Sequence, residues 1–317
     1  MYRSLSCAPL TWATLCLLVP AGLVLGGGSL LAEDFDLSPS SISRSEILSG
    51  GPGKDGIPAL SSPALVGATE ARYLRPEDRV VGIARGADIR AYPLRILNWH
   101  EVVNDTVDGE PIVVTYCPLT DSAVAFDRSV AGKVLDFGVS GRLYRSNVLM
   151  YDRQTDSLWS QLAARGVTGS MNETVLRPLP VEVTTWADWH SRHPTTRVLS
   201  LATGYHRDYD RDPYARYRHS SRTMFPVGHL DERLPAKDLV IGVRGGSISK
   251  AYPLRALPAA GVVDKVGDRA IRVRFDPIAK RGTVSEADSD RAVPSVVLYW
   301  FAWSAFYPDT GLWAGDR

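Results

Sequence analysis

The sequence predicts an α+β fold that is dominated by strands and built as two related lobes from an internal duplication. The run VVGIARGADIRAYPLRIL at 80–97 aligns without gaps to VIGVRGGSISKAYPLRAL at 240–257, with nine of eighteen positions identical. The similarity resumes farther on, where TWADWHSRHPTT at 185–196 resembles YWFAWSAFYPDT at 299–310. A unit that recurs in this way indicates a copied scaffold.

Each copy begins with two β-rich runs around a glycine turn, at Arg85–Asp88 and at Arg244–Ser247, which predicts a hairpin. Pro93 stands where it can start a helix, and LRILNWHEVVN has apolar residues at helical spacing. The strands predicted next in the first copy are IVVTY, AVAF, VLDFGV, VLMYD and SLWS, the last two flanking the polar turn RQTD.

These observations divide the chain into four parts. Residues 1–32 are expected to be a signal peptide or an N-terminal anchor, and residues 33–69 an irregular lead-in rich in Ser, Gly and Pro. Residues 70–234 are expected to form the first lobe, with an insert that the second lobe lacks. Residues 235–317 are expected to form the second, degenerate lobe.

The N-terminal segment also indicates where the protein works. Arg3 precedes an uncharged, largely apolar stretch from Ala8 to Gly28, which predicts export to the periplasm or the outside of the cell. Pro20 and the glycines at 26–28 disfavour a permanent membrane helix, so membrane contact is expected only if this segment stays uncleaved. With 36 basic and 35 acidic residues, the composition gives no indication of nucleic-acid binding.

Cleavage near Ala32 would remove Cys7 and Cys16 and leave Cys117 as the single cysteine. A lone thiol in an oxidising compartment is a metal ligand, a nucleophile or redox centre, an intermolecular partner or a small core residue. His100 is the nearest histidine and could lower the thiol pKa or share a metal. In the second copy the corresponding residues are Asp276 and Ala260, so the scaffold was copied without this pair.

The insert beside Cys117 carries the polar residues expected to hold a small polar ligand. They lie in FGVSGRLYRSNVLMYDRQTDSLWSQ at 137–161 and are Ser140, Arg142, Arg145, Ser146, Asn147, Tyr151, Asp152, Trp159 and Gln161. The same groups could instead satisfy one another in a long turn. Met150 is a third candidate ligand, with Cys117 and His100, for copper or zinc, although methionine is more often a core residue.

Several long motifs together resemble one family. They are GGPGKDGIPAL (50–60), AYPLRILNWHEVVND (91–105), VTYCPLTDSAVAFDR (114–128), the 137–161 insert and RDYDRDPY (207–214). Over residues 45–315 the chain is similar to the bacterial and archaeal family known as domain of unknown function 3179. The resemblance implies a recurring exported domain and assigns no reaction, cofactor or catalytic residue.

Three classes of function therefore stay open. The first is a thiol-dependent enzyme or redox protein acting on a small polar ligand, with Cys117 and His100 as the catalytic pair. The second is a copper- or zinc-binding protein, and the third is a non-catalytic module that binds a ligand or partner between its lobes. The sequence has no phosphate loop, nucleotide fingerprint or serine-elbow pattern, which argues against the common hydrolase and nucleotide-binding classes.

Overall fold

A computed structural model describes residues 35–315, and the predicted signal segment lies outside these residues. Strands dominate this part of the chain, as the sequence predicts, and its helices are short. The four α-helices are α1 (Leu94–His100), α2 (Trp186–Arg192), α3 (Ala215–His219) and α4 (Trp300–Phe306). The 3-10 turns are η1 (Arg44–Glu46), η2 (Gly169–Met171) and η3 (Leu254–Ala256). Among the described residues no helix is long and apolar enough to span a membrane.

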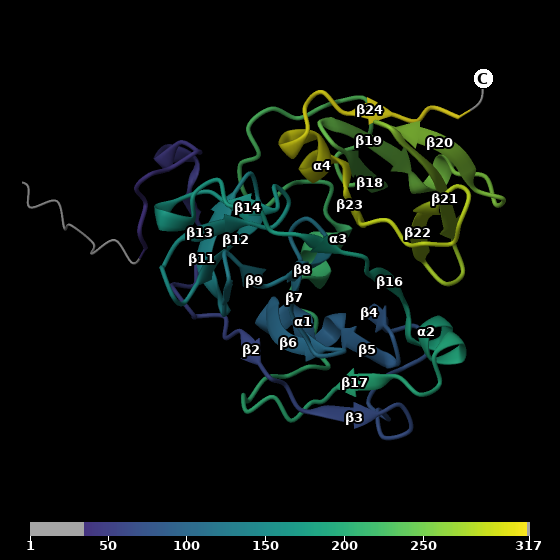
Figure 1. Ribbon diagram of the computed structural model, residues 1–317, viewed down its shortest axis with the longest axis horizontal. Helices are drawn as coiled ribbons and strands as arrows, with labels where there is room; N and C mark the ends of the chain where they lie inside the picture. The colour runs from purple at the N-terminus through teal and green to yellow at the C-terminus, as the bar shows by residue number, and fades with distance from the viewer. Residues whose placement is uncertain (1–34, 316–317) are drawn as a thin grey trace, which may run out of the picture. The chain divides into compact units, whose positions relative to one another are not determined.

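Five sheets make up the described chain (Figure 1), together with a ribbon of β9 (Ser129–Val130) and β10 (Lys133–Val134). Sheet I has the order β16 (Glu182–Thr185), β4 (Arg79–Arg85), β5 (Asp88–Pro93), β17 (Arg197–Leu199), β3 (Leu65–Gly67). Sheet II has the order β15 (Pro178–Leu179), β8 (Ser122–Asp127), β7 (Glu110–Cys117), β6 (Val102–Val107), β2 (Leu60–Ser61).

The other three sheets complete the set. Sheet III has the order β1 (Leu48–Ser49), β11 (Phe137–Tyr144), β12 (Asn147–Asp152), β13 (Leu158–Ser160), β14 (Arg165–Gly166). Sheet IV has the order β23 (Ser295–Tyr299), β18 (Leu239–Gly245), β19 (Ile248–Pro253), β24 (Gly311–Leu312). Sheet V has the order β20 (Val262–Val266), β21 (Arg269–Asp276), β22 (Arg281–Glu286).

The predicted local elements are present. β4 and β5 pair as a hairpin with Arg85 opposite Asp88, and α1 begins directly after Pro93. The predicted run VLDFGV is interrupted, because its first residue belongs to the β9–β10 ribbon and β11 begins only at Phe137. The lead-in is largely irregular, yet it contributes one edge strand each to sheets I, II and III.

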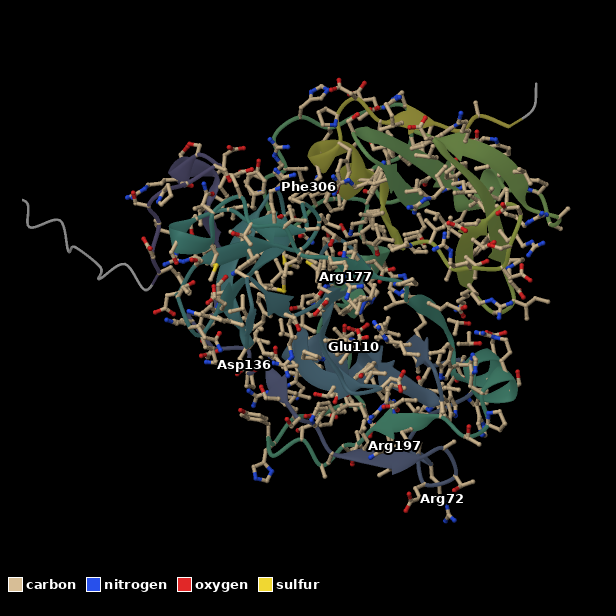
Figure 2. The ribbon with its side chains drawn as sticks, in the orientation of Figure 1. Arg72, Glu110, Asp136, Arg177, Arg197 and Phe306 are labelled. Atoms are coloured by element: carbon tan, nitrogen blue, oxygen red, sulfur yellow. The ribbon has the colours of Figure 1, made fainter. Side chains whose placement is uncertain are left out.

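The sheets follow one another around a ring, as in a five-bladed β-propeller. Sheet I contacts sheet II through β5 and β6, and sheet II contacts sheet III through β6 and β11. Sheet III meets α4, which directly follows β23 of sheet IV, where Tyr144 packs edge-on against Phe306, with ring centroids 5.4 Å apart; Figure 2 labels Phe306. Sheet IV contacts sheet V through β18 and β20, and β22 closes the ring on β16 of sheet I.

This arrangement does not divide into the two lobes that the sequence predicts. Residues 35–315 belong to one compact unit, because the ring packs sheets from both halves of the sequence against each other. The repeated segments nevertheless pair alike: Val80 faces Pro93 in sheet I, and Val240 faces Pro253 in sheet IV. The 137–161 insert supplies most of sheet III, which has no counterpart among the sheets of the second half.

The repeated tryptophans have one packing role. A Cβ atom added at Gly82 would lie 2.3 Å from the ring of Trp189, and one added at Gly242 would lie 2.3 Å from the ring of Trp303. Both tryptophans are fully buried. Each indole therefore lies flat against a strand where only glycine leaves room for it.

Candidate functional site

Cys117 is the last residue of β7 and lies in the core where sheets II, III and IV meet. It is a free cysteine and is fully buried. The sulfur accepts hydrogen bonds from the Thr120 hydroxyl and from the backbone N–H groups of Thr120 and Val148, and these favour the thiolate. Burial, together with the charge of Glu101, outweighs them and raises the pKa of Cys117 to about 11. The resting sulfur is therefore a neutral thiol.

Glu101 is the unexpected neighbour of this thiol. It follows α1 directly, is buried, and forms no ion pair within residues 35–315. Its side chain accepts a hydrogen bond of 3.4 Å from the hydroxyl of Tyr214. Burial raises the pKa of Glu101 to about 8, despite the lowering effect of Tyr214. The carboxyl group is consequently protonated at neutral pH. It ionises, and can then act as a base, when the pH rises slightly above neutral.

The backbone of Glu101 is unusual as well. Its φ of 57° and ψ of −32° lie in a region that favours glycine. In the ungapped alignment of the two copies the opposite residue is Gly261, with a φ of 75°. The first copy thus has the buried Glu101 where the second copy has Gly261, and glycine is the residue that adopts a positive φ without strain. Strain retained at one side chain is typical of functional positions.

We expect this strain to be measurable. Glu101→Gly should be more stable than Glu101→Ala by about 1 kcal/mol, because alanine keeps the left-handed strain and glycine relieves it at some cost in unfolded-state entropy. Urea unfolding of the two variants measures the difference. Equal stabilities would mean that residue 101 adopts another backbone conformation in solution.

Glu101 lines a cavity of about 320 Å³ that adjoins Cys117. Leu119, Leu143 and Val148 line it and also pack in the same core cluster as Cys117. The remaining lining residues are Gly50, Pro52, Ile57, Val139, Gly141, Arg142, Pro213, Tyr214, Met224 and Phe225. The wall is therefore mostly apolar, with three polar side chains, from Glu101, Arg142 and Tyr214, that can orient a ligand.

One segment, residues 203–219, covers the end of α1 and closes this region; we call it the strap. Trp99 donates its indole N–H to the Arg211 carbonyl at 3.2 Å, and Asn98 contacts Asp212 at 3.4 Å. The strap also places Tyr214 on Glu101. A segment more than 100 residues away in the sequence therefore completes the cavity wall.

His100 anchors the strap rather than the thiol. Its Nδ1 lies 2.7 Å from the Pro58 carbonyl oxygen and its Nε2 lies 2.6 Å from the Tyr209 hydroxyl. The carbonyl can only accept, so Nδ1 carries the proton and Nε2 accepts from Tyr209. Burial lowers the pKa of His100, although the hydrogen bond to the Pro58 carbonyl raises it. The lowered pKa keeps the ring neutral. Both ring nitrogens are thus engaged away from Cys117, with which the sequence analysis paired His100.

Two of the predicted ligand residues form a polar cluster beside Cys117. Asn147 donates to the Thr120 hydroxyl at 3.0 Å and to Gln161 Oε1 at 2.8 Å. Gln161 also accepts from Ser122 at 2.8 Å. The Thr120 hydroxyl lies 2.8 Å from the Ser122 hydroxyl, and its hydrogen bonding lowers the pKa of Cys117, so this buried cluster shapes the polar surroundings of the thiol.

Three predicted residues shape the strand and turn beside the cavity. The Ser140 hydroxyl accepts from the Arg142 N–H at 2.9 Å and donates to the Leu149 carbonyl, which holds a bulge in β11. Arg145 and Ser146 form the β11–β12 turn, with φ values of 50° and 62°. Arg145 also donates to the Ala305 carbonyl, so it joins sheet III to α4. Ser146 is buried and its Oγ has no hydrogen-bond partner.

The remaining predicted residues have structural contacts elsewhere. Asp152 accepts the indole N–H of Trp159 at 2.8 Å, and Tyr151 donates to Asp55 at 2.5 Å. Met150 packs with Trp159 in an apolar cluster separate from that of Cys117. Among residues 35–315, no three His, Cys, Asp or Glu side chains gather to hold a metal ion.

The sequence patterns did not point to Glu101, Tyr214 or Thr120. The repeat contained a signal for the first of them, since a glutamate stands opposite Gly261 directly after the helix. Nothing local indicates Tyr214, which reaches Glu101 only through the path of the strap. The chain therefore brings together Cys117, Glu101, Tyr214 and Arg142, of which only the first and last were predicted.

Comparison with known proteins identifies a family but no activity. A family model described as protein of unknown function (DUF3179) matches residues 54–291. Neither the curated proteins nor the solved structures include a match to this chain. The family model covers well over half of the 317 residues, which confirms the membership that the sequence motifs predict. The chain belongs to the DUF3179 family of proteins of unknown function.

Proposed function

We propose that this protein carries out thiol chemistry on a small polar ligand, with Cys117 as nucleophile and Glu101, in place of His100, as its proton acceptor. The observation that carries the proposal is the buried Glu101, which lines a ligand-sized cavity, together with the buried thiol of Cys117, which packs behind the Leu119, Leu143 and Val148 side of its wall. His100, whose ring nitrogens bind Pro58 and Tyr209, positions the strap.

The step we propose is addition of the thiol to a carbonyl carbon of the ligand. The ionised carboxylate of Glu101 takes the thiol proton as the sulfur–carbon bond forms. The carbonyl π electrons move onto the carbonyl oxygen, and the Tyr214 hydroxyl donates a hydrogen bond to that oxygen. Arg142, which forms no ion pair within residues 35–315, is placed on the cavity wall to bind a polar group of the ligand.

We propose that this chemistry takes place outside the cytoplasm, in the periplasm or beyond. The support is the N-terminal sequence, in which Arg3 precedes an apolar stretch that ends in small residues near Ala32.

We also propose that sheets I and II share an origin with sheets IV and V. Support comes from corresponding positions in the two sets. Cys117 faces Ser122 at the end of one hairpin, and Asp276 faces Arg281 at the end of the other. Tyr92 donates to Asp105 at 2.7 Å, and Tyr252 donates to Asp264 at 2.9 Å. On this view the site arose in one copy after duplication.

Alkylation of Cys117 tests the proposed proton transfer. In the wild type, the rate of reaction with iodoacetamide should rise as the pH passes about 8, where Glu101 ionises. Glu101→Gln should react at least ~10-fold more slowly at about pH 8.5, because the thiol loses its base. The rates are measured by mass spectrometry of the Cys117 peptide, and the Glu110→Gln protein serves as the control with an exposed acid.

The opposite sign would refute the proposal. If Glu101 acts on Cys117 only through its charge, its removal lowers the thiol pKa and Glu101→Gln reacts faster than the wild type. Equal rates in the two proteins would likewise exclude Glu101 as the proton acceptor. A comparison with the urea-unfolded proteins, whose thiols should react alike, corrects for reagent and labelling differences.

A further inference from the structure

A second cavity, of about 380 Å³, lies where elements of sheets II, III, IV and V face one another. Its wall includes the buried side chains of Phe126, Leu162 and Trp303. Arg244 and Arg269 also line it and are exposed. The cavity therefore has an apolar interior and a cationic end that meets solvent.

The two guanidinium groups have no acidic partner of their own. Within residues 35–315 neither forms an ion pair, whereas Arg281 in the same sheet as Arg269 binds Asp188 at 2.9 Å. The pKa of Glu286 is lowered mainly by Arg291, with which it pairs, and only weakly by the more distant Arg269. Arg244 lies over the ring of Tyr307, with its guanidinium carbon 5.2 Å from the ring centroid, which orients it without neutralising it.

We propose that this cavity binds a medium-chain carboxylate, with the carboxylate between Arg244 and Arg269 and the chain along the apolar wall. Arginine can donate two parallel, charge-assisted hydrogen bonds to a carboxylate. A ligand with a neutral head group cannot form this charged pair. At about 30 Å³ for each water-sized group, a cavity of 380 Å³ holds roughly a dozen non-hydrogen atoms. Decanoate, with ten carbons and two oxygens, has that size.

Cys117 and Glu101 do not line this cavity, so the proposed ligand does not depend on the proposed thiol chemistry, although Gln161 of the polar cluster beside Cys117 lies in its wall. The test is calorimetric titration of the full chain with decanoate, with decanol and acetate as separate probes for the chain and the head group. Decanoate should bind at least ~10-fold more tightly than either probe. Arg244→Gln and Arg269→Gln should each weaken decanoate binding by about 10-fold or more, since each removes charge-assisted hydrogen bonds.

Arg72→Gln is the matched control, because Arg72 is an exposed arginine beside sheet I, away from this cavity (Figure 2). It should leave decanoate affinity unchanged. Equal affinities for decanol and decanoate would remove the role of the arginines and overturn the proposal. So would acetate binding as tightly as decanoate, equal losses in all three variants, or no heat of binding with any probe.

Discussion

Replacing Glu101 by glutamine should stabilise the protein at alkaline pH and leave its stability unchanged in acid. The pKa of Glu101 is about 8 in the folded protein, against an ordinary value of 4.5. Below about pH 4.5 both the folded and the unfolded chain hold the proton, so the acid costs nothing extra. Between these two values only the unfolded chain releases it, and the free energy of unfolding falls by roughly 1.4 kcal/mol for each pH step.

The difference between the wild type and Glu101→Gln therefore accumulates from about pH 4.5 to about pH 8 and reaches several kcal/mol. Glutamine has the shape of the protonated acid but cannot ionise, so its stability lacks this slope. The Cys117 thiol does not affect stability between about pH 4.5 and about pH 8. Folding raises its pKa from about 9 to about 11, so its contribution to the free energy of unfolding changes only above about pH 9.

Urea unfolding at about pH 4.5 and about pH 8.5 measures the effect. Glu110→Gln is the control, since Glu110 is exposed and pairs with Arg85 at the surface. Its stability should follow that of the wild type at both pH values. An equal pH dependence of stability for the wild type and Glu101→Gln would mean that folding does not raise the pKa of Glu101, and the proposed proton acceptor would then lose its main physical basis.

A protein that pays for a buried acid in this way must retain it for another reason. The alternative residue is present in the same chain, because the second copy has Gly261 at the aligned position with a similar φ. Removing the acid would relieve both the backbone strain and the desolvation of the carboxyl group. If the protein becomes more stable when Glu101 is replaced, Glu101 is a residue kept for function at the expense of stability.

The sequence could predict the hairpins and α1 because their signals are local. Alternating apolar residues and a glycine turn define β4 and β5, and Pro93 marks where α1 begins. The closure of the five sheets into a ring was not predictable in the same way. It depends on contacts such as β22 against β16 and Tyr144 against Phe306, which no periodicity encodes.

The same division applies to the site. Cys117 could be singled out because it is the one cysteine outside the predicted signal segment, and the repeat separates it from Asp276. His100 was the nearest histidine by sequence, yet its two partners are 42 and 109 residues away, and they turn both ring nitrogens from the thiol. Glu101 looks like an ordinary solvated residue at a helix end until its burial and its φ are known.

The turn that holds the Cys117 region should depend on one buried carboxylate, that of Asp121. This side chain accepts two hydrogen bonds of 3.0 Å from Arg79 and one of 2.7 Å from the Tyr116 hydroxyl. Asp121→Asn keeps the shape and tolerates the φ of 52° at this position, but it leaves the Arg79 charge without its counter-charge. We expect a loss of about 3–5 kcal/mol in the free energy of unfolding.

Two comparisons separate the charge from the shape of Asp121. Glu110→Gln makes the same acid-to-amide change in an exposed pair with Arg85 and should cost less than about 1 kcal/mol. Adding Arg79→Met to Asp121→Asn should restore part of the loss, since no unpaired charge then remains, whereas independent effects would make the double variant worse. Urea unfolding of the four proteins decides between these outcomes. Because Thr120 lies in this turn and donates to the Cys117 sulfur, recovery of the wild-type alkylation rate in the double variant would link the ion pair to the thiol.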